Sequence, residues 1–137
     1  LGNKKVLHLI SAADHPETPQ REQLLGAAER LNEWLIAEQG DQAVHLVNRW
    51  QIQSRRGTVT DAVRDEIRNL RRRALKEAAA NVDLLDACCA ILLGDKADIN
   101  NAVDGLAPQA AEQLRGWPIW SLVSQSGDDI AQTDGRS

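Results

Sequence analysis

The chain of 137 residues contains no Phe, no Tyr and no Met, so four Trp residues supply all of its aromatic surface. Cysteine is nearly as scarce, with only Cys88 and Cys89, which are adjacent in an apolar run. Two neighbouring cysteines are the wrong arrangement for a disulfide framework and only half of a four-ligand zinc site. Free Cys is among the most buried residue types, so we interpret the pair as reduced core thiols.

Long apolar runs are also missing. The uncharged run ACCAILLG is far too short to span a bilayer, and no basic, apolar and small-residue sequence of the signal-peptide type opens the chain. We therefore expect a cytoplasmic protein without membrane partners. The composition, 42% hydrophobic and 26% charged, is typical of a globular protein, and the length is typical of one domain.

Motifs that bind phosphates or carry catalysis are absent in their usual form: G-x-x-x-x-G-K-[ST], G-x-G-x-x-G, G-x-S-x-G and H-E-x-x-H. A calcium loop starting at Asp98 would lack Gly at its sixth position and Glu at its twelfth. His8 and His45 have no further ligands at a metal-site spacing. We therefore predict no metal and no cofactor.

Amphipathic segments predict three helices. The first has Thr18 as its N-cap and Pro19 at its first position, and it ends at Gly40. The second follows a Thr60 cap, with an apolar stripe of Val63, Ile67, Leu70, Ala74 and Ala78. The third lies at 107–116, with Pro108 near its start and Gly116 as its stop.

Apolar runs between these helices are interpreted as strands, at 4–11, 42–52, 87–93 and 117–124. The run at 81–95 is the hardest to assign, because periodicity does not separate a short buried strand from a buried helix. We favour a strand there because Gly94 and Asp95 punctuate its end.

The resulting βαβαβαβ order predicts an α/β fold. We expect a single three-layer domain at 1–125, with a four-stranded, mostly parallel sheet covered by helices on both faces, and a polar tail at 126–137. The preferred strand order is 2-1-3-4, a flavodoxin-like arrangement. Such a sheet places a crevice at the carboxyl ends of the first and third strands.

Charge is distributed unevenly. Residues 55–76 hold eight Lys and Arg against three acidic residues, a net of +5, so the remainder carries −9 of the total of −4. Within this segment cations recur at four-residue spacing in the second predicted helix, where like charges at i,i+4 repel one another. Arg71, Arg72 and Lys76 have no acidic residue three or four positions away.

This basic row admits two interpretations. Charge runs usually form a solvated face, and Arg stems cover apolar surface. The functional hypothesis is a non-catalytic binding module, because Arg forks recognise carboxylates and phosphates. Its partner would be an acidic protein surface, nucleic acid, or the protein itself in a homo-oligomer, through the acidic first helix. The residues assigned to this role are Arg64, Arg68, Arg71, Arg72 and Lys76.

An alternative hypothesis uses the loops at the carboxyl edge of the predicted sheet. A small enzyme or sensor would bind a nucleotide or a phosphorylated metabolite there, helped by the N-terminus of the first helix. Polar residues are common where strands end, so ordinary loop chemistry also explains them. Whether there is catalysis is left open. The residues assigned to this alternative are Asp14, His15, Thr18, Asp95, Lys96 and Ser124.

Overall fold

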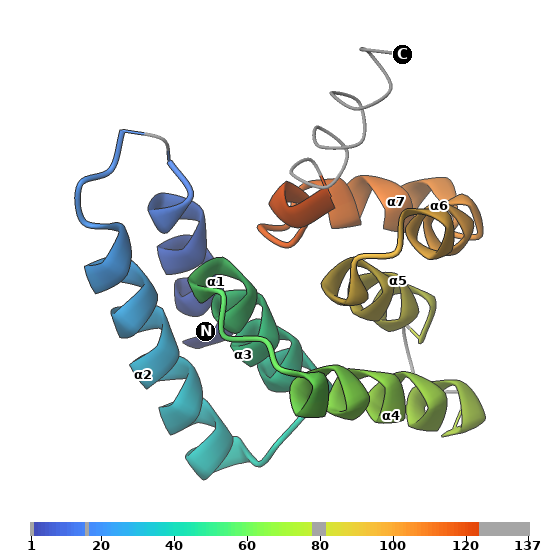
Figure 1. Ribbon diagram of the computed structural model, residues 1–137, viewed down its shortest axis with the longest axis horizontal. Coiled ribbons are helices and arrows are strands. Elements are labelled where there is room, and N and C mark those ends of the chain that lie inside the picture. The colour runs from blue at the N-terminus through green and yellow to red at the C-terminus, as the bar shows by residue number, and fades with distance from the viewer. Residues whose placement is uncertain (1, 16, 78–81, 124–137) are drawn as a thin grey trace. The chain divides into compact units, whose positions relative to one another are not determined.

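The structure, a computed structural model, describes residues 2–15, 17–77 and 82–123 (Figure 1). Seven helices are defined in those ranges, and residues 120–123 are also helical, but the ranges contain no strand. The predicted α/β fold with its four-stranded sheet and flavodoxin-like architecture is therefore wrong. The helices are α1 (Gly2–Ala13), α2 (Arg21–Gln39), α3 (Ala43–Arg56), α4 (Asp61–Glu77), α5 (Val82–Leu93), α6 (Lys96–Asp104) and α7 (Pro108–Arg115).

The first predicted strand, 4–11, lies inside α1. Val6, Ile10 and Ala13 are separated by four and three residues and are all buried, which makes them one stripe of a helix. Val and Ile favour strands only weakly, and tertiary packing readily overrides that preference. The strand prediction at 4–11 followed the residue types of this run, whereas the spacing of its buried residues fits a helix.

The second predicted strand, 42–52, lies in α3 and failed for another reason. His45, Asn48 and Gln51 are buried in α3 and, being three residues apart, lie on one helical stripe. An apolar stripe is the usual signature of a buried helical face, so a polar one escaped notice. Val44, an apolar residue of the same run, is 43% exposed.

The predicted strand at 87–93 is also wrong, because this run belongs to α5. Most residues of α5 are buried, so the helix is apolar on nearly all sides and shows no amphipathic period. Even so, no helix in the described part of the chain is long and apolar enough to cross a membrane. The last predicted strand, 117–124, is wrong over its described residues, where a turn precedes the helical residues 120–123.

The three helices predicted from amphipathic patterns are confirmed as α2, α4 and α7. Gly40 follows α2 with a φ of 85°, a left-handed value that disfavours other residues. Pro108 stands in the first turn of α7, and Gly116 follows its last residue. In α4 the stripe of Ile67, Leu70 and Ala74 is buried and Val63 is half-buried, whereas Ala78 lies outside the described residues.

The predicted helix caps fared differently. Thr60 caps α4, since its Oγ1 accepts a hydrogen bond from the Val63 amide at 3.2 Å. Thr18 is not the cap of α2: its hydroxyl donates to the carbonyl of Ala12 at 3.1 Å, and α2 begins at Arg21. The Thr18 hydroxyl thus ties the loop back to the end of α1.

The chain divides into two compact units, residues 1–63 and 64–137, with the division inside α4. A single domain at 1–125 stays a prediction, because one continuous helix crosses the division. The predicted tail at 126–137 lies outside the described residues.

In the first unit α1 and α2 lie side by side, and α3 packs against α2 (Figure 1). Their shared core is aliphatic and draws on all three helices. Burying each Val, Leu or Ile side chain contributes about 1.5–3 kcal/mol to folding. The core consists of Val6, Ile10, Ala28, Leu35 and Ile52, with Leu9 and Leu31 packed against it.

In the second unit α6 and α7 pack against α5. The two cysteines lie within α5, at 4% exposure for Cys88 and 0% for Cys89, and both thiols are free. Burial raises the pKa of each thiol to about 12. The interpretation of these residues as buried core thiols is confirmed, although they lie on a helix and not on a strand.

Native protein should therefore react slowly with thiol reagents. Thiolate is the reactive form, and a pKa near 12 leaves very little of it at pH 8, so labelling should be at least about a hundredfold slower than in the unfolded chain. Absorbance of released thionitrobenzoate, with and without denaturant, measures both rates. Labelling of native protein at the unfolded rate would contradict the burial of both thiols.

Candidate functional site

The basic row of the sequence lies on α4. The helix turns about 100° per residue, so Ile67, Leu70 and Ala74 form its buried stripe. Arg71 lies on the flank next to that stripe, and Arg68 and Arg72 lie further round toward solvent. Position around the helix axis therefore divides residues that sequence spacing placed in one group.

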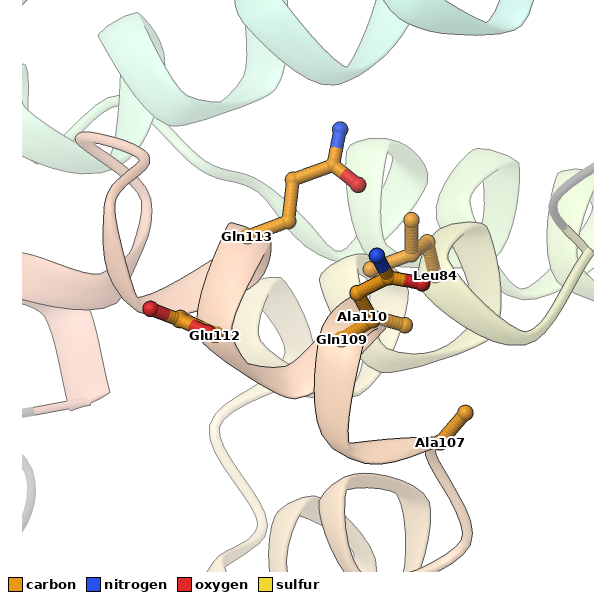
Figure 2. Close-up of a pocket in the computed structure, with 6 residues that line it drawn as sticks. All are labelled: Leu84, Ala107, Gln109, Ala110, Glu112 and Gln113. Atoms are coloured by element: carbon orange, nitrogen blue, oxygen red, sulfur yellow. The ribbon is translucent and has the colours of Figure 1, made fainter.

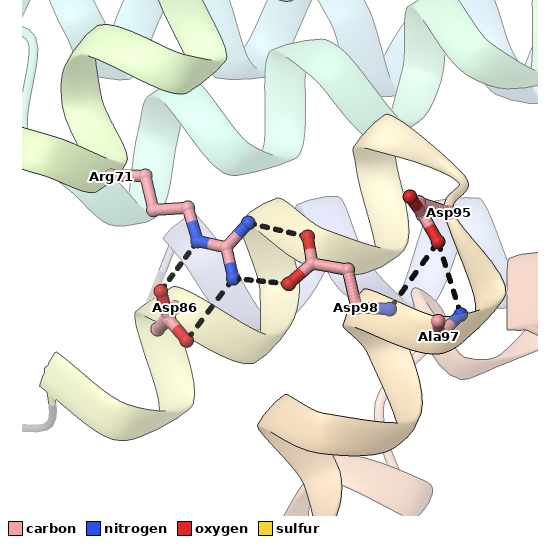
Figure 3. A network of polar contacts seen from close by, with 5 residues as sticks. All are labelled: Arg71, Asp86, Asp95, Ala97 and Asp98. Carbon is pink, nitrogen blue, oxygen red and sulfur yellow. Dashed lines mark hydrogen bonds and ion pairs between the residues drawn. The ribbon is translucent and has the colours of Figure 1, made fainter.

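Arg71 is held between two aspartates of the second unit (Figure 3). Its Nε donates to Asp86 Oδ1 at 2.5 Å, and its Nη1 and Nη2 donate to the two carboxylate oxygens of Asp98 at 2.6 and 2.8 Å. The hydrogen bonds to Asp98, and to a smaller extent those to Asp86, hold the pKa of the Arg71 guanidinium above its ordinary value. The hydrogen bond from Arg71 in turn lowers the pKa of the Asp98 carboxyl.

This cluster of Arg71, Asp86 and Asp98 ties α4 to α5 and α6. Arg71 has no acid three or four positions away, but the fold supplies acids that lie 15 and 27 residues further along the chain. Arg71 is therefore a structural residue within its own unit. No pattern local to α4 could have revealed this pairing.

The solvent side of α4 keeps its cations. Arg68 pairs with Asp65 at 2.9 Å, and Arg72 donates to the amide oxygen of Asn69. Lys76 is exposed and has no ion-pair partner among the described residues. We call the exposed residues Arg68, Arg72 and Lys76 the basic face. Arg64, also exposed, has an interaction partner of its own.

Three carboxylates of the acidic helix considered as a possible self-partner are already paired inside the first unit. Glu22 and Glu29 of α2 both pair with Arg56, at 3.7 and 3.1 Å. Glu33 of α2 forms a two-bond contact with Arg49, with distances of 2.9 and 2.7 Å. Arginines of α3 therefore compete for the carboxylates that a second copy's α4 would need.

The residues of the alternative hypothesis lie in both units. In the first unit Asp14 pairs with Arg55, His15 is exposed, and Thr18 bonds to the end of α1. In the second unit Asp95 caps α6 by accepting from the amides of Ala97 and Asp98, as Figure 3 shows, and Lys96 is exposed. Ser124 lies outside the described residues. The alternative hypothesis expected these residues to meet at the carboxyl edge of a sheet, and the described residues contain no sheet. The site therefore stays a prediction, and the described structure offers no sheet edge for it.

Sequence reasoning missed a row of buried polar side chains on α3. Asn48 donates to Asn3 Oδ1 of α1, and Gln51 donates to Asn48 Oδ1 at 3.0 Å. Arg55, one turn further, donates to both carboxylate oxygens of Asp14, each at 2.7 Å. Asp14, a candidate ligand residue, is thus the counterion of a buried arginine. The signal available in the sequence was the helical spacing of Asn48, Gln51 and Arg55.

A shallow groove in the second unit lies between α5 and the first turns of α7 (Figure 2). Figure 2 shows the side chains of Glu112 and Gln113 pointing in different directions, so their polar ends do not converge on one ligand position. None of the predicted site residues lines this groove. Its lining residues are Leu84, Ala107, Gln109, Ala110, Glu112 and Gln113.

Two further observations bear on function. Within the described ranges no group of three or more His, Cys, Asp or Glu residues is arranged to hold a metal ion. Comparison of the chain with protein-family models, with curated proteins and with solved structures finds no match.

Proposed function

We propose that the protein is a binding module that docks an acidic protein surface through the basic face of α4. The observation that carries the proposal is the arrangement of Arg68, Arg72 and Lys76, three exposed cations on one stripe of a helix. Asp65 is the one acid paired with that stripe among the described residues. Such unbalanced positive charge favours and orients association with an anionic surface.

The choice of a protein partner follows from charge. Nucleic-acid binding normally draws on a broad basic patch, whereas this chain carries a net charge of −4 and the basic face has three cations. Self-association through α2 is disfavoured because Arg56 and Arg49 occupy three of its carboxylates. Nucleic acid and a second copy of the chain remain distinct outcomes of the test below.

The proposal also places the interaction in the cytoplasm. Both cysteines are free and neither forms a disulfide. Reduced thiols are the normal state of cysteine in cytosolic proteins. The proposed partner is accordingly an acidic cytoplasmic protein.

Removal of the basic face should weaken binding to an acidic polypeptide. The full chain with Arg68→Gln, Arg72→Gln and Lys76→Gln keeps helix propensity nearly unchanged, because Arg, Lys and Gln are similar helix formers. Each exposed contact contributes about 0.2–1 kcal/mol, so affinity for poly-L-glutamate at low salt should fall about tenfold. Fluorescence anisotropy measures the affinity, and circular dichroism checks that the fold is intact.

A matched control removes three exposed cations elsewhere, with Lys4→Gln, Lys5→Gln and Lys96→Gln. This variant has the same net charge, so it should lose less than about threefold in affinity if position matters more than total charge. Equal losses in the two variants would overturn the proposal. Duplex DNA that binds more tightly than poly-L-glutamate would overturn the protein partner in favour of nucleic acid. Salt-sensitive dimerisation seen by sedimentation would overturn it in favour of a second copy of the chain.

A further inference from the structure

Leu75 is an apolar side chain with no role in the core of its unit. It is 54% exposed, although its neighbours Leu70 and Ala74 on α4 are buried. Around the helix it lies next to Arg68 and Arg72, which are seven and three residues before it. An exposed leucine beside exposed arginines combines an apolar anchor with charged residues, as protein interfaces do.

The two sides of Leu75 carry opposite charge. On the side toward the buried stripe lies the cluster of Arg71, Asp86 and Asp98, whose one cation and two carboxylates sum to −1. On the other side lies the basic face. A partner that covers Leu75 would therefore keep its carboxylates away from Asp86 and Asp98 and place them on the basic face.

We propose that this surface binds an acidic amphipathic helix of a partner protein, whose apolar residue packs on Leu75 while its carboxylates pair with Arg68, Arg72 and Lys76. The inference rests on the proposed function and specifies its partner. Two independent features point to this occupant. The basic face is complementary to carboxylates, and the exposed Leu75 is complementary to an apolar side chain; an acidic amphipathic helix offers both.

The spacing of the basic face favours a helical partner. Arg68, Arg72 and Lys76 follow one another at four-residue intervals, which corresponds to a rise of about 6 Å between successive cations. Acidic residues at four-residue intervals on a partner helix repeat at the same distance, with an apolar stripe beside them. A phosphate backbone offers the same charge but no aliphatic group to cover Leu75.

The test uses the full chain and two synthetic helical peptides of equal charge. Both carry Glu at four-residue intervals; one has Leu on the adjoining stripe, and the other has Gln there. Wild-type protein should bind the leucine peptide about five- to tenfold more tightly than the glutamine peptide, as expected for covering one aliphatic side chain. Leu75→Gln should abolish that preference, and Leu75→Met should keep it, because Met also offers an apolar surface.

The outcomes separate this inference from the proposed function. If both peptides bind wild type equally and depend on the basic face, the inference is overturned and the proposed function stands. If neither peptide depends on Arg68, Arg72 and Lys76, both are overturned. Duplex DNA that binds more tightly than the leucine peptide at the same ionic strength, with no effect of Leu75→Gln, would also overturn the inference and identify a phosphate partner.

Discussion

Replacing Asp14 with Asn should lower the free energy of unfolding by about 3 kcal/mol. The Arg55 side chain is only 1% exposed, and it donates two hydrogen bonds to the Asp14 carboxylate. These bonds offset the cost of burying the guanidinium charge. The variant keeps the shape of the side chain but removes the negative charge. The backbone carbonyl of Gln51 still accepts a hydrogen bond from Arg55 Nη1 at 3.1 Å. We therefore expect a loss of stability at the lower end of the range for a broken buried ion pair.

Glu33→Gln is the matched control for this prediction. It also removes a carboxylate that pairs with two nitrogens of an arginine, Arg49, but that pair is solvent-exposed. Exposed pairs contribute about 0–1 kcal/mol, so this variant should be nearly neutral. Urea unfolding followed by circular dichroism gives both values. A loss for Asp14→Asn no larger than that for Glu33→Gln would show that the buried pair does not hold the end of α1 to α3.

The second large effect concerns Arg71. Arg71→Gln should cost about 2–3 kcal/mol, because it breaks charge-assisted hydrogen bonds to Asp86 and Asp98 and leaves two carboxylates without their common cation. Arg72→Gln, one position further along α4, changes an exposed residue and should stay within about 0.5 kcal/mol. Chemical unfolding of the two variants compares neighbouring arginines directly, and equal stabilities would contradict the structural role of Arg71.

The same cluster predicts a pH dependence. The pKa of Asp98 is lower in the folded protein, so the stability it contributes is complete above its unfolded pKa of about 3.9 and is lost as pH falls through the lower, folded value. Wild type should therefore exceed Asp98→Asn in stability at pH 6, and the difference should shrink as the pH is lowered toward 2. A difference that grows with acidity would have the wrong sign for this ion pair.

The helices that could be predicted from the sequence are those with an apolar stripe and clear ends. In α4 both the Thr60 cap and the stripe of Ile67, Leu70 and Ala74 are as expected, and in α7 Pro108 and Gly116 mark the two ends. These signals are local, so they survive whatever the tertiary fold is. The strand assignments depended on short apolar runs instead, and Gly94 and Asp95, which we interpreted as the end of a strand, in fact follow α5.

The remaining elements depend on contacts between distant segments. α3 buries Asn48 and Gln51, which is favourable only because Asn3 of α1 meets Asn48 and the side chains bond to one another. α5 is buried by neighbouring helices on most sides, which removes the period that distinguishes helix from strand. In both cases the partners that make the burial favourable lie outside the segment itself.

The candidate site shows the same division between local and distant information. Arg68, Arg72 and Lys76 are exposed on α4, where the four-residue spacing placed them. Arg71 shares their sequence neighbourhood but is paired with Asp86 and Asp98. Removing Arg71 together with Arg72 and Lys76 would therefore mix a loss of stability with a loss of charge, so the binding variant leaves Arg71 in place.

The location of the bound anion tests the central claim most directly. Titration of isotope-labelled protein with the leucine peptide, followed through the arginine side-chain Nε resonances, should shift Arg68 and Arg72 and leave Arg71 nearly unchanged. Methyl resonances of Leu75 should move over the same range of peptide concentration. The largest shifts at Arg21, Arg30 or Arg115, with Arg68, Arg72 and Leu75 unaffected, would show that α4 does not carry the binding surface.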